Sequence, residues 1–215
     1  MTSTIDSTHP TATDPRPILD RAIATAGTVI AGVRPDQFGA PTPCPEMDVR
    51  AMVGHLVGVL GRVGALGRGD DPFSVGDATG PDDGWTVAWA AAAAGTVAAW
   101  SDDATLDRPM ALPWIQGSGA EVLTSYFSEL TVHTWDLAVA TGQQPAWNEV
   151  VLTAALEARP ILPAEGRLAL FEQISASIGA EDVAVPFGEA VAVAADAPAI
   201  DRLVAWNGRD PRWRS

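Results

Sequence analysis

The chain has 215 residues, a length typical of one domain with at most a small addition. All 13 basic side chains are Arg and none is Lys, against 27 Asp and Glu, so the formal net charge is -14. So acidic a protein would repel a phosphate backbone, which argues against nucleic-acid binding. The absence of Lys excludes a Walker-type phosphate loop, a Schiff base and a lysine general base.

The N-terminus and the cysteine usage bear on the compartment. Cys44 is the single cysteine, so no internal disulfide can form, and a reducing compartment is the simplest interpretation. Residues 1–16 are polar and Thr-rich, without the apolar run of a signal peptide, and we expect a disordered leader there. Residues 85–100 carry no charge but are too few and too Ala-rich to span a bilayer. We therefore expect a cytoplasmic protein that does not contact a membrane.

Four long segments with apolar residues at three- and four-residue spacing dominate residues 17–145, and we predict one four-helix bundle there. Asp48 and Ser118 stand where an N-cap side chain is needed, before the second and fourth segments. Gly142 follows the fourth segment and predicts its end. The predicted helices span 17–33, 48–67, 83–101 and 118–141.

The connections and the C-terminal part are less regular. The Gly-, Asp- and Pro-rich stretch 67–84 predicts a long surface loop, and 107–119 predicts a loop or a short hairpin. Residues 146–215 form a C-terminal extension that we expect to pack on the bundle. Its predicted elements are helices at 147–158 and 168–178, a small β-hairpin of residues 182–186 and 189–194, and a last helix capped by Asp196. The fold class is therefore mainly α.

One group of residues has the composition of a metal site. Glu129 and His133 are four residues apart on the fourth helix, so both side chains face the same way. His55 lies in the middle of the second helix, toward or beside the core. If these two helices are neighbours, two imidazoles and one carboxylate converge, which is a donor set for a divalent cation with open positions.

A purely structural interpretation of the same residues also stands. His55 can be a hydrogen-bonded, half-buried histidine, and Glu129 with His133 can be an ordinary ion pair on the helix surface. The pair is not the HExxH signature of metalloproteases, because here the Glu precedes the His.

Four further residues are candidates with weaker signals. Asp136 lies one turn beyond His133 and could orient its imidazole as a catalytic-site group, or it could be solvated or paired with an Arg. Cys44 is more plausibly a small packed apolar residue than a reactive thiol, because no other His or Lys lies nearby in sequence. Trp114 and Trp135 could each contact a ligand or belong to the core.

Several strings together resemble a known family. The strings are Pro41-Thr-Pro-Cys-Pro-Glu-Met-Asp-Val-Arg, Val53-Gly-His-Leu-Val-Gly, Glu129-Leu-Thr-Val-His-Thr-Trp-Asp-Leu-Ala-Val-Ala-Thr-Gly and Asp201-Arg-Leu-Val-Ala-Trp-Asn-Gly-Arg-Asp-Pro. They resemble small bacterial metal-binding proteins of the DinB-like superfamily, which are related to the N-terminal domain of mycothiol-dependent maleylpyruvate isomerase.

The resemblance implies a four-helix bundle of up-down-down-up type. It also implies a divalent metal held by His55, Glu129 and His133, the positions that match the ligands of the family. Zn is the first expectation, but two imidazoles and one carboxylate suit Ni or Fe(II) as well, so the ligand types do not decide the metal. Mycothiol is implied as a thiol cosubstrate, although the C-terminal extension is much shorter than the sterol-carrier-like second domain of the isomerase.

These observations lead to one leading function and two alternatives. An open position on a divalent cation can lower the pKa of a small thiol or of water. The leading hypothesis is a metal-dependent transferase or isomerase that uses a low-molecular-weight thiol and acts on a small electrophile. The alternatives are a metal-dependent hydrolase or lyase without thiol, and a metal-binding protein without turnover. We expect a small-molecule substrate and a monomer or homodimer.

Overall fold

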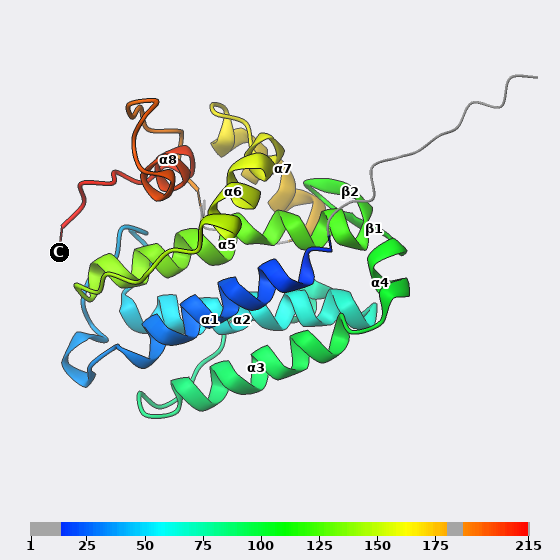
Figure 1. The fold of residues 1–215 in the computed structure, drawn as a ribbon, viewed down its shortest axis with the longest axis horizontal. Coiled ribbons are helices and arrows are strands. Elements are labelled where there is room, and N and C mark those ends of the chain that lie inside the picture. Colours follow the sequence, from blue (N-terminus) through cyan, green and yellow to red (C-terminus); the bar gives the residue numbers. More distant parts are fainter. Residues whose placement is uncertain (1–13, 180–186, 215) are drawn as a thin grey trace, which may run out of the picture.

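The computed structural model describes residues 14–179 and 187–214 of the chain, and this part is mainly α-helical. Figure 1 shows that the first and last of the four long helices run in one direction and the other two in the opposite direction. The predicted up-down-down-up bundle is therefore confirmed. Its helices are α1 (Arg16–Ala31), α2 (Val49–Arg68), α3 (Trp85–Ala99) and α5 (Gly119–Ala140).

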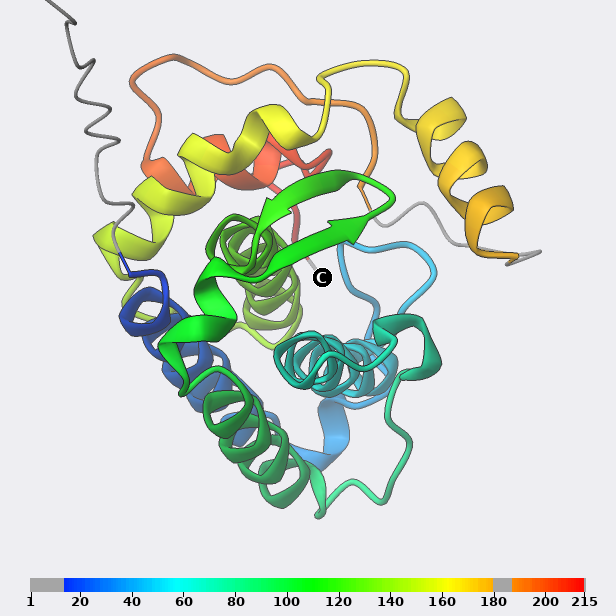
Figure 2. The same cartoon turned by 90° about the vertical axis from the view of Figure 1, so that its right-hand side faces the viewer.

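The order of the helices around the bundle decides which side chains can meet. Both α1 and α2 pack against α3 and α5, so α1 and α2 lie at opposite corners, as the view down the bundle shows (Figure 2). Helix α2 therefore has α5 as a direct neighbour. The second and fourth long segments of the sequence lie side by side, as the predicted site requires.

The capping residues read from the sequence fix where α2 and α5 begin. The Asp48 carboxylate accepts a hydrogen bond from the backbone N–H of Ala51 at 2.8 Å. The Ser118 hydroxyl accepts from the N–H of Glu121, whose carboxylate accepts in return from the N–H of Ser118 at 2.7 Å. Both caps satisfy N–H groups that a helix start leaves without partners.

Most residues of helix α2 are buried. Its length and mean hydropathy of 1.3 would suffice for a membrane span, but 72% of that apolar window is buried inside the protein. This degree of burial is typical of a helix in the core of a globular protein. The apolar side chains of α2 pack into one continuous core with those of α1, α3, α5 and α6 (Glu149–Ala158).

The predicted loop or hairpin at 107–119 is a hairpin. A short helix, α4 (Asp103–Asp107), precedes it, and the antiparallel strands are β1 (Pro109–Leu112) and β2 (Ile115–Ser118). Leu112 pairs with Ile115 beside the turn, and both strands pack against α5.

The C-terminal extension also consists mostly of helices. Helix α6 packs on α5 and α1, while α8 (Ala199–Trp206) packs on α6 and α5, so both cover the bundle on the α5 side (Figure 1). The two helices that follow α6 in the chain are α7 (Arg167–Ile178) and α8 (Ala199–Trp206).

Two expectations for the extension need correction. Helix α8 begins at Ala199 and has Pro198 rather than Asp196 at its N-cap, without a side-chain cap. Residues 189–194, the second predicted strand, form no strand, and residues 182–186 lie outside the described residues. The N–H of Val191 instead donates to the carbonyl of Ala205 at 2.8 Å, so this extended segment is tied to α8.

Trp100 offers a test of the bundle packing. Its side chain is 1% exposed, and its indole N–H donates to the carbonyl of Val63 in α2 at 2.8 Å. We expect Trp100→Phe to lower the free energy of unfolding by about 1 to 3 kcal/mol, because a buried bond and part of the packing are lost. Urea unfolding followed by circular dichroism measures this. Val87→Ala, at a position of α3 that is 72% exposed, is the control and should leave the curve almost unchanged.

Candidate metal centre

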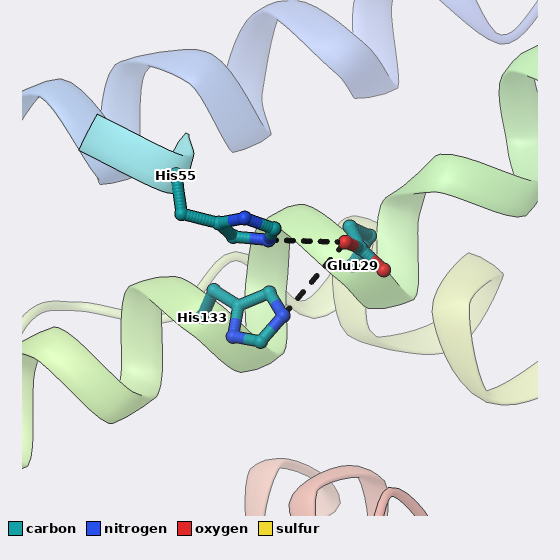
Figure 3. A group of neighbouring side chains, drawn as sticks. All are labelled: His55, Glu129 and His133. Atoms are coloured by element: carbon teal, nitrogen blue, oxygen red, sulfur yellow. Dashed lines mark hydrogen bonds and ion pairs between the residues drawn. The ribbon is translucent and has the colours of Figure 1, made fainter. Parts of the chain in front are cut away.

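Two neighbouring helices bring the three predicted ligands together. His55 projects from the middle of α2, and its side chain is 9% exposed. Glu129 and His133 lie one turn apart in the middle of α5, where His133 is fully buried and Glu129 is 22% exposed. Figure 3 shows the two imidazoles and the carboxylate pointing toward a common centre. We call these three residues the triad.

The distances within the triad suit one shared cation. Nε2 of His55 lies 3.3 Å from Oε1 of Glu129, and Nε2 of His133 lies 3.8 Å from the same oxygen. One donor atom from each of the three residues lies within 4.8 Å of the others. The two imidazole rings meet nearly edge to face, with centroids 4.8 Å apart. Two nitrogens and one carboxylate oxygen are a donor set that divalent Zn, Ni and Fe accept.

The His133 ring carries the most direct sign that a cation fits. Its Nδ1 lies 3.0 Å from Oδ2 of Asp136, and because an ionised carboxylate only accepts, Nδ1 carries the proton of that hydrogen bond. In the neutral form of this ring, Nε2 is then an acceptor with a free lone pair. It is buried and forms no hydrogen bond, because the 3.8 Å to Glu129 is too long. A buried acceptor without a partner is rare, and a cation at the triad would satisfy it.

The charges of neighbouring side chains shift the pKa values of Glu129 and His55 in opposite directions. Burial alone would raise the pKa of Glu129, but the hydrogen bond and the positive charge of His55, together with the Arg62 guanidinium, hold it at about 2. Burial likewise lowers the pKa of His55, and the carboxylates of Asp77 and Glu129 on its two sides outweigh this and raise it to about 9. The site therefore holds an ionised carboxylate and favours positive charge between its side chains.

Asp136 stands behind His133, on the side away from the triad. It is fully buried, and its two oxygens accept hydrogen bonds from the Arg209 guanidinium at 3.0 Å each. Burial raises the pKa of Asp136, but the bonds from His133 and Arg209 bring it below its usual value. Asp136 therefore contacts the His133 ring from behind, where an orienting group would lie, and its role in the site stays a prediction.

The C-terminal extension therefore takes part in the site. Arg209 follows α8, and its guanidinium also lies over the ring of Phe187, 5.7 Å from the centroid. Phe187 in turn stacks on the imidazole of His133 at 5.3 Å between centroids. Neither residue was among the sequence candidates. The string around Arg209 contributed to the family resemblance, but nothing local linked it to Asp136.

Comparison with known proteins places these residues in a family. Residues 19–138 match the Mycothiol maleylpyruvate isomerase N-terminal domain, a span that includes the whole triad and Asp136. The chain belongs to this family. Two uncharacterized proteins of Mycobacterium tuberculosis, from strains CDC 1551 / Oshkosh and ATCC 25618 / H37Rv, are each 26% identical over 200 residues. The alignments cover 93% of this chain and 100% of each relative. No solved structure matches the chain.

Besides Arg209 and Phe187, one more residue at the site was not among the sequence candidates. Asp77 comes from the stretch 67–84, which we expected to be a surface loop, and its Oδ2 lies 3.0 Å from Nδ1 of His55. The sequence signal that was available lies in α2, where Gly54 and Gly58 are one helical turn apart. Two glycines so placed can indicate that another backbone segment packs closely against the helix. Spacing alone did not say which segment would approach.

The other three sequence candidates are not members of the triad. Cys44 is 4% exposed, and burial raises the pKa of its thiol, which favours the packed interpretation over a reactive thiol. Trp135 is 5% exposed and belongs to the core. Trp114 is only partly buried, and its ring meets those of Phe73 and Tyr126 edge to face.

The Arg209–Asp136 pair should make a large contribution to stability. We expect Arg209→Met to lower the free energy of unfolding by about 3 to 5 kcal/mol, because the buried Asp136 carboxylate loses its main countercharge. Thermal and urea unfolding measure the loss. Arg212→Met is the matched control, since Arg212 pairs with Asp210 on the surface and is 87% exposed. Equal stability of the two variants would contradict this account of the pair.

Proposed function

We propose that the triad binds one divalent cation, with Zn as the first candidate and Ni or Fe(II) as alternatives. The observation that carries the proposal is the buried Nε2 of His133, which forms no hydrogen bond and has an ionised Glu129 beside it. Membership of the mycothiol maleylpyruvate isomerase N-terminal family supports it. His55, Glu129 and His133 would each supply one ligand atom, which leaves at least one position for a small molecule.

The residues around the triad prepare it for chemistry. A bound divalent cation would supply Lewis acidity that lowers the pKa of a thiol or of water at neutral pH. Asp136 holds the proton of His133 at Nδ1, so that Nε2 stays available as a ligand atom. Phe187 stacks on the same ring and shields it from water on that side. The described residues thus hold the His133 ring in one orientation.

We propose further that the protein is a thiol-dependent transferase or isomerase that acts on a small electrophile, with mycothiol or a similar thiol as cosubstrate. The thiolate sulfur would add to an activated C=C bond, whose electron pair moves into the adjacent carbonyl as an enolate. Rotation about the resulting single bond and expulsion of the thiolate re-form the double bond in the other geometry. If the enolate takes a proton instead, the thioether remains and the reaction is a transfer.

Metal content tests the first part of the proposal. We expect about one divalent cation per chain by elemental analysis of the purified protein, and its loss in His133→Ala, because a three-residue ligand set loses one of its two imidazoles. His9→Ala removes a histidine outside the described residues and is the matched control. Unchanged metal content in His133→Ala would remove the premise of the proposal.

Turnover tests the second part. We expect the metal-loaded protein to consume a cis-configured, carbonyl-activated alkene only when mycothiol is present, as followed by absorbance or NMR. Glu129→Gln should lower the rate by more than about 100-fold, since removing a metal ligand reduces activity more than removing a residue that only hydrogen-bonds to a ligand. Ester or amide cleavage without thiol would favour a hydrolase or lyase instead. Tight metal retention without either reaction would favour a binding protein without turnover.

A further inference from the structure

A short segment of the connection between α2 and α3 lies unusually close to α2. A Cβ atom at Gly54 would come 2.3 Å from the carbonyl oxygen of Ala78, and one at Gly58 would come 2.8 Å from Cα of Asp77. Real Cβ atoms do not approach backbone atoms so closely, so only glycine at these positions lets residues 75–78 lie on the helix. We call residues 75–78 the strap.

Polar contacts fasten the strap at both ends. The N–H of Ala78 donates to the carbonyl of Gly54 at 2.9 Å, and Nε of Arg62 donates to the carbonyl of Val75 at 3.0 Å. The Arg62 guanidinium also forms an ion pair with the Asp77 carboxylate. Arg62 and Gly54 both belong to α2, so the same helix that carries His55 determines where the strap lies.

The strap places one carboxylate oxygen on the ring of His55. Oδ2 of Asp77 lies 3.0 Å from Nδ1, while Nε2 on the other side of the ring faces Glu129 at 3.3 Å. Asp77 therefore lies on the side of the His55 ring that faces away from Glu129, and it is not a fourth ligand candidate. A carboxylate in that place fixes the ring orientation, holds the proton at Nδ1 and makes Nε2 a better ligand.

We propose that Asp77, held by the strap, is a positioning residue of the metal centre and aims Nε2 of His55 at the cation. The inference rests on the proposed function, because it concerns how one ligand of that cation is held. Asp136 does the same for His133, but the two carboxylates differ in their surroundings. Asp136 is fully buried, whereas the Asp77 side chain is 42% exposed, so Asp77 can be replaced without opening the core.

Substitution of Asp77 tests the proposal directly. We expect Asp77→Ala to weaken Zn and Co(II) binding by about 10- to 100-fold in isothermal titration calorimetry. The visible absorption bands of the Co(II) protein should also change, because the His55 ligand is no longer held in one orientation. Asp77→Asn keeps an acceptor oxygen for Nδ1–H and should recover part of the affinity. Asp82→Asn is the control, since Asp82 lies in the same connection but pairs with Arg50.

A second pair of variants moves the strap and keeps Asp77. Gly58→Ala adds a methyl group that must displace the backbone of Asp77, although Ala itself favours the helix. We expect metal affinity to fall and the Co(II) bands to change as in Asp77→Ala. Gly95→Ala in α3 is the matched control: its Cβ would meet nothing within 4 Å, so affinity should stay at the wild-type value.

The outcomes separate this inference from the function on which it rests. If the wild-type protein binds neither Zn nor Co(II), the proposed function and this inference fail together. If the wild type binds and both Asp77→Ala and Gly58→Ala bind within twofold of it with unchanged Co(II) bands, only the inference is overturned. In that case the ion pair of Arg62 and Asp77 serves to fasten the connection and nothing more.

Discussion

The arrangement of the whole site depends on two hydrogen bonds between carboxylates and the outer nitrogens of two imidazoles. Asp77 is hydrogen-bonded to Nδ1 of His55, and Asp136 is hydrogen-bonded to Nδ1 of His133. In each ring, therefore, only Nε2 faces the space beside Glu129. Each carboxylate is paired with an arginine, Arg62 for the first and Arg209 for the second. The acidic side chains around the two histidines thus determine the orientation of the imidazole rings as well as the charge at the site.

The part of this arrangement that could be predicted from sequence has local causes. Apolar spacing and the caps at Asp48 and Ser118 follow from rules that act within one helix, and the structure confirms the bundle that they predict. The spacing of Glu129 and His133 needs nothing beyond the helical repeat. The position of His55 beside them required one further assumption, that α2 and α5 are neighbours, and the family resemblance supplied the bundle topology behind it.

The rest depends on contacts between residues far apart in the sequence. Asp77 reaches His55 from a stretch that reads as an ordinary polar loop, and Arg209 reaches Asp136 from the C-terminal extension. Periodicity and capping rules cannot predict such pairs, because these rules use only residues that are close in sequence, and the pairs leave no mark on those residues. The pattern of alternating residues at 189–194 misled for a similar reason: strand pairing needs a partner, and this segment is hydrogen-bonded to α8 instead.

The pairing of Asp136 with Arg209 also bears on how the protein folds during synthesis. Residues 19–138, which match the family, contain Asp136 but not Arg209, which follows about 70 positions later. At the usual pace of translation this gap lasts roughly 4 to 15 seconds. A bundle that closed during that interval would bury the Asp136 carboxylate without this countercharge, which is unfavourable. We therefore expect the bundle to close fully only when Arg209, which follows α8, can pair with Asp136.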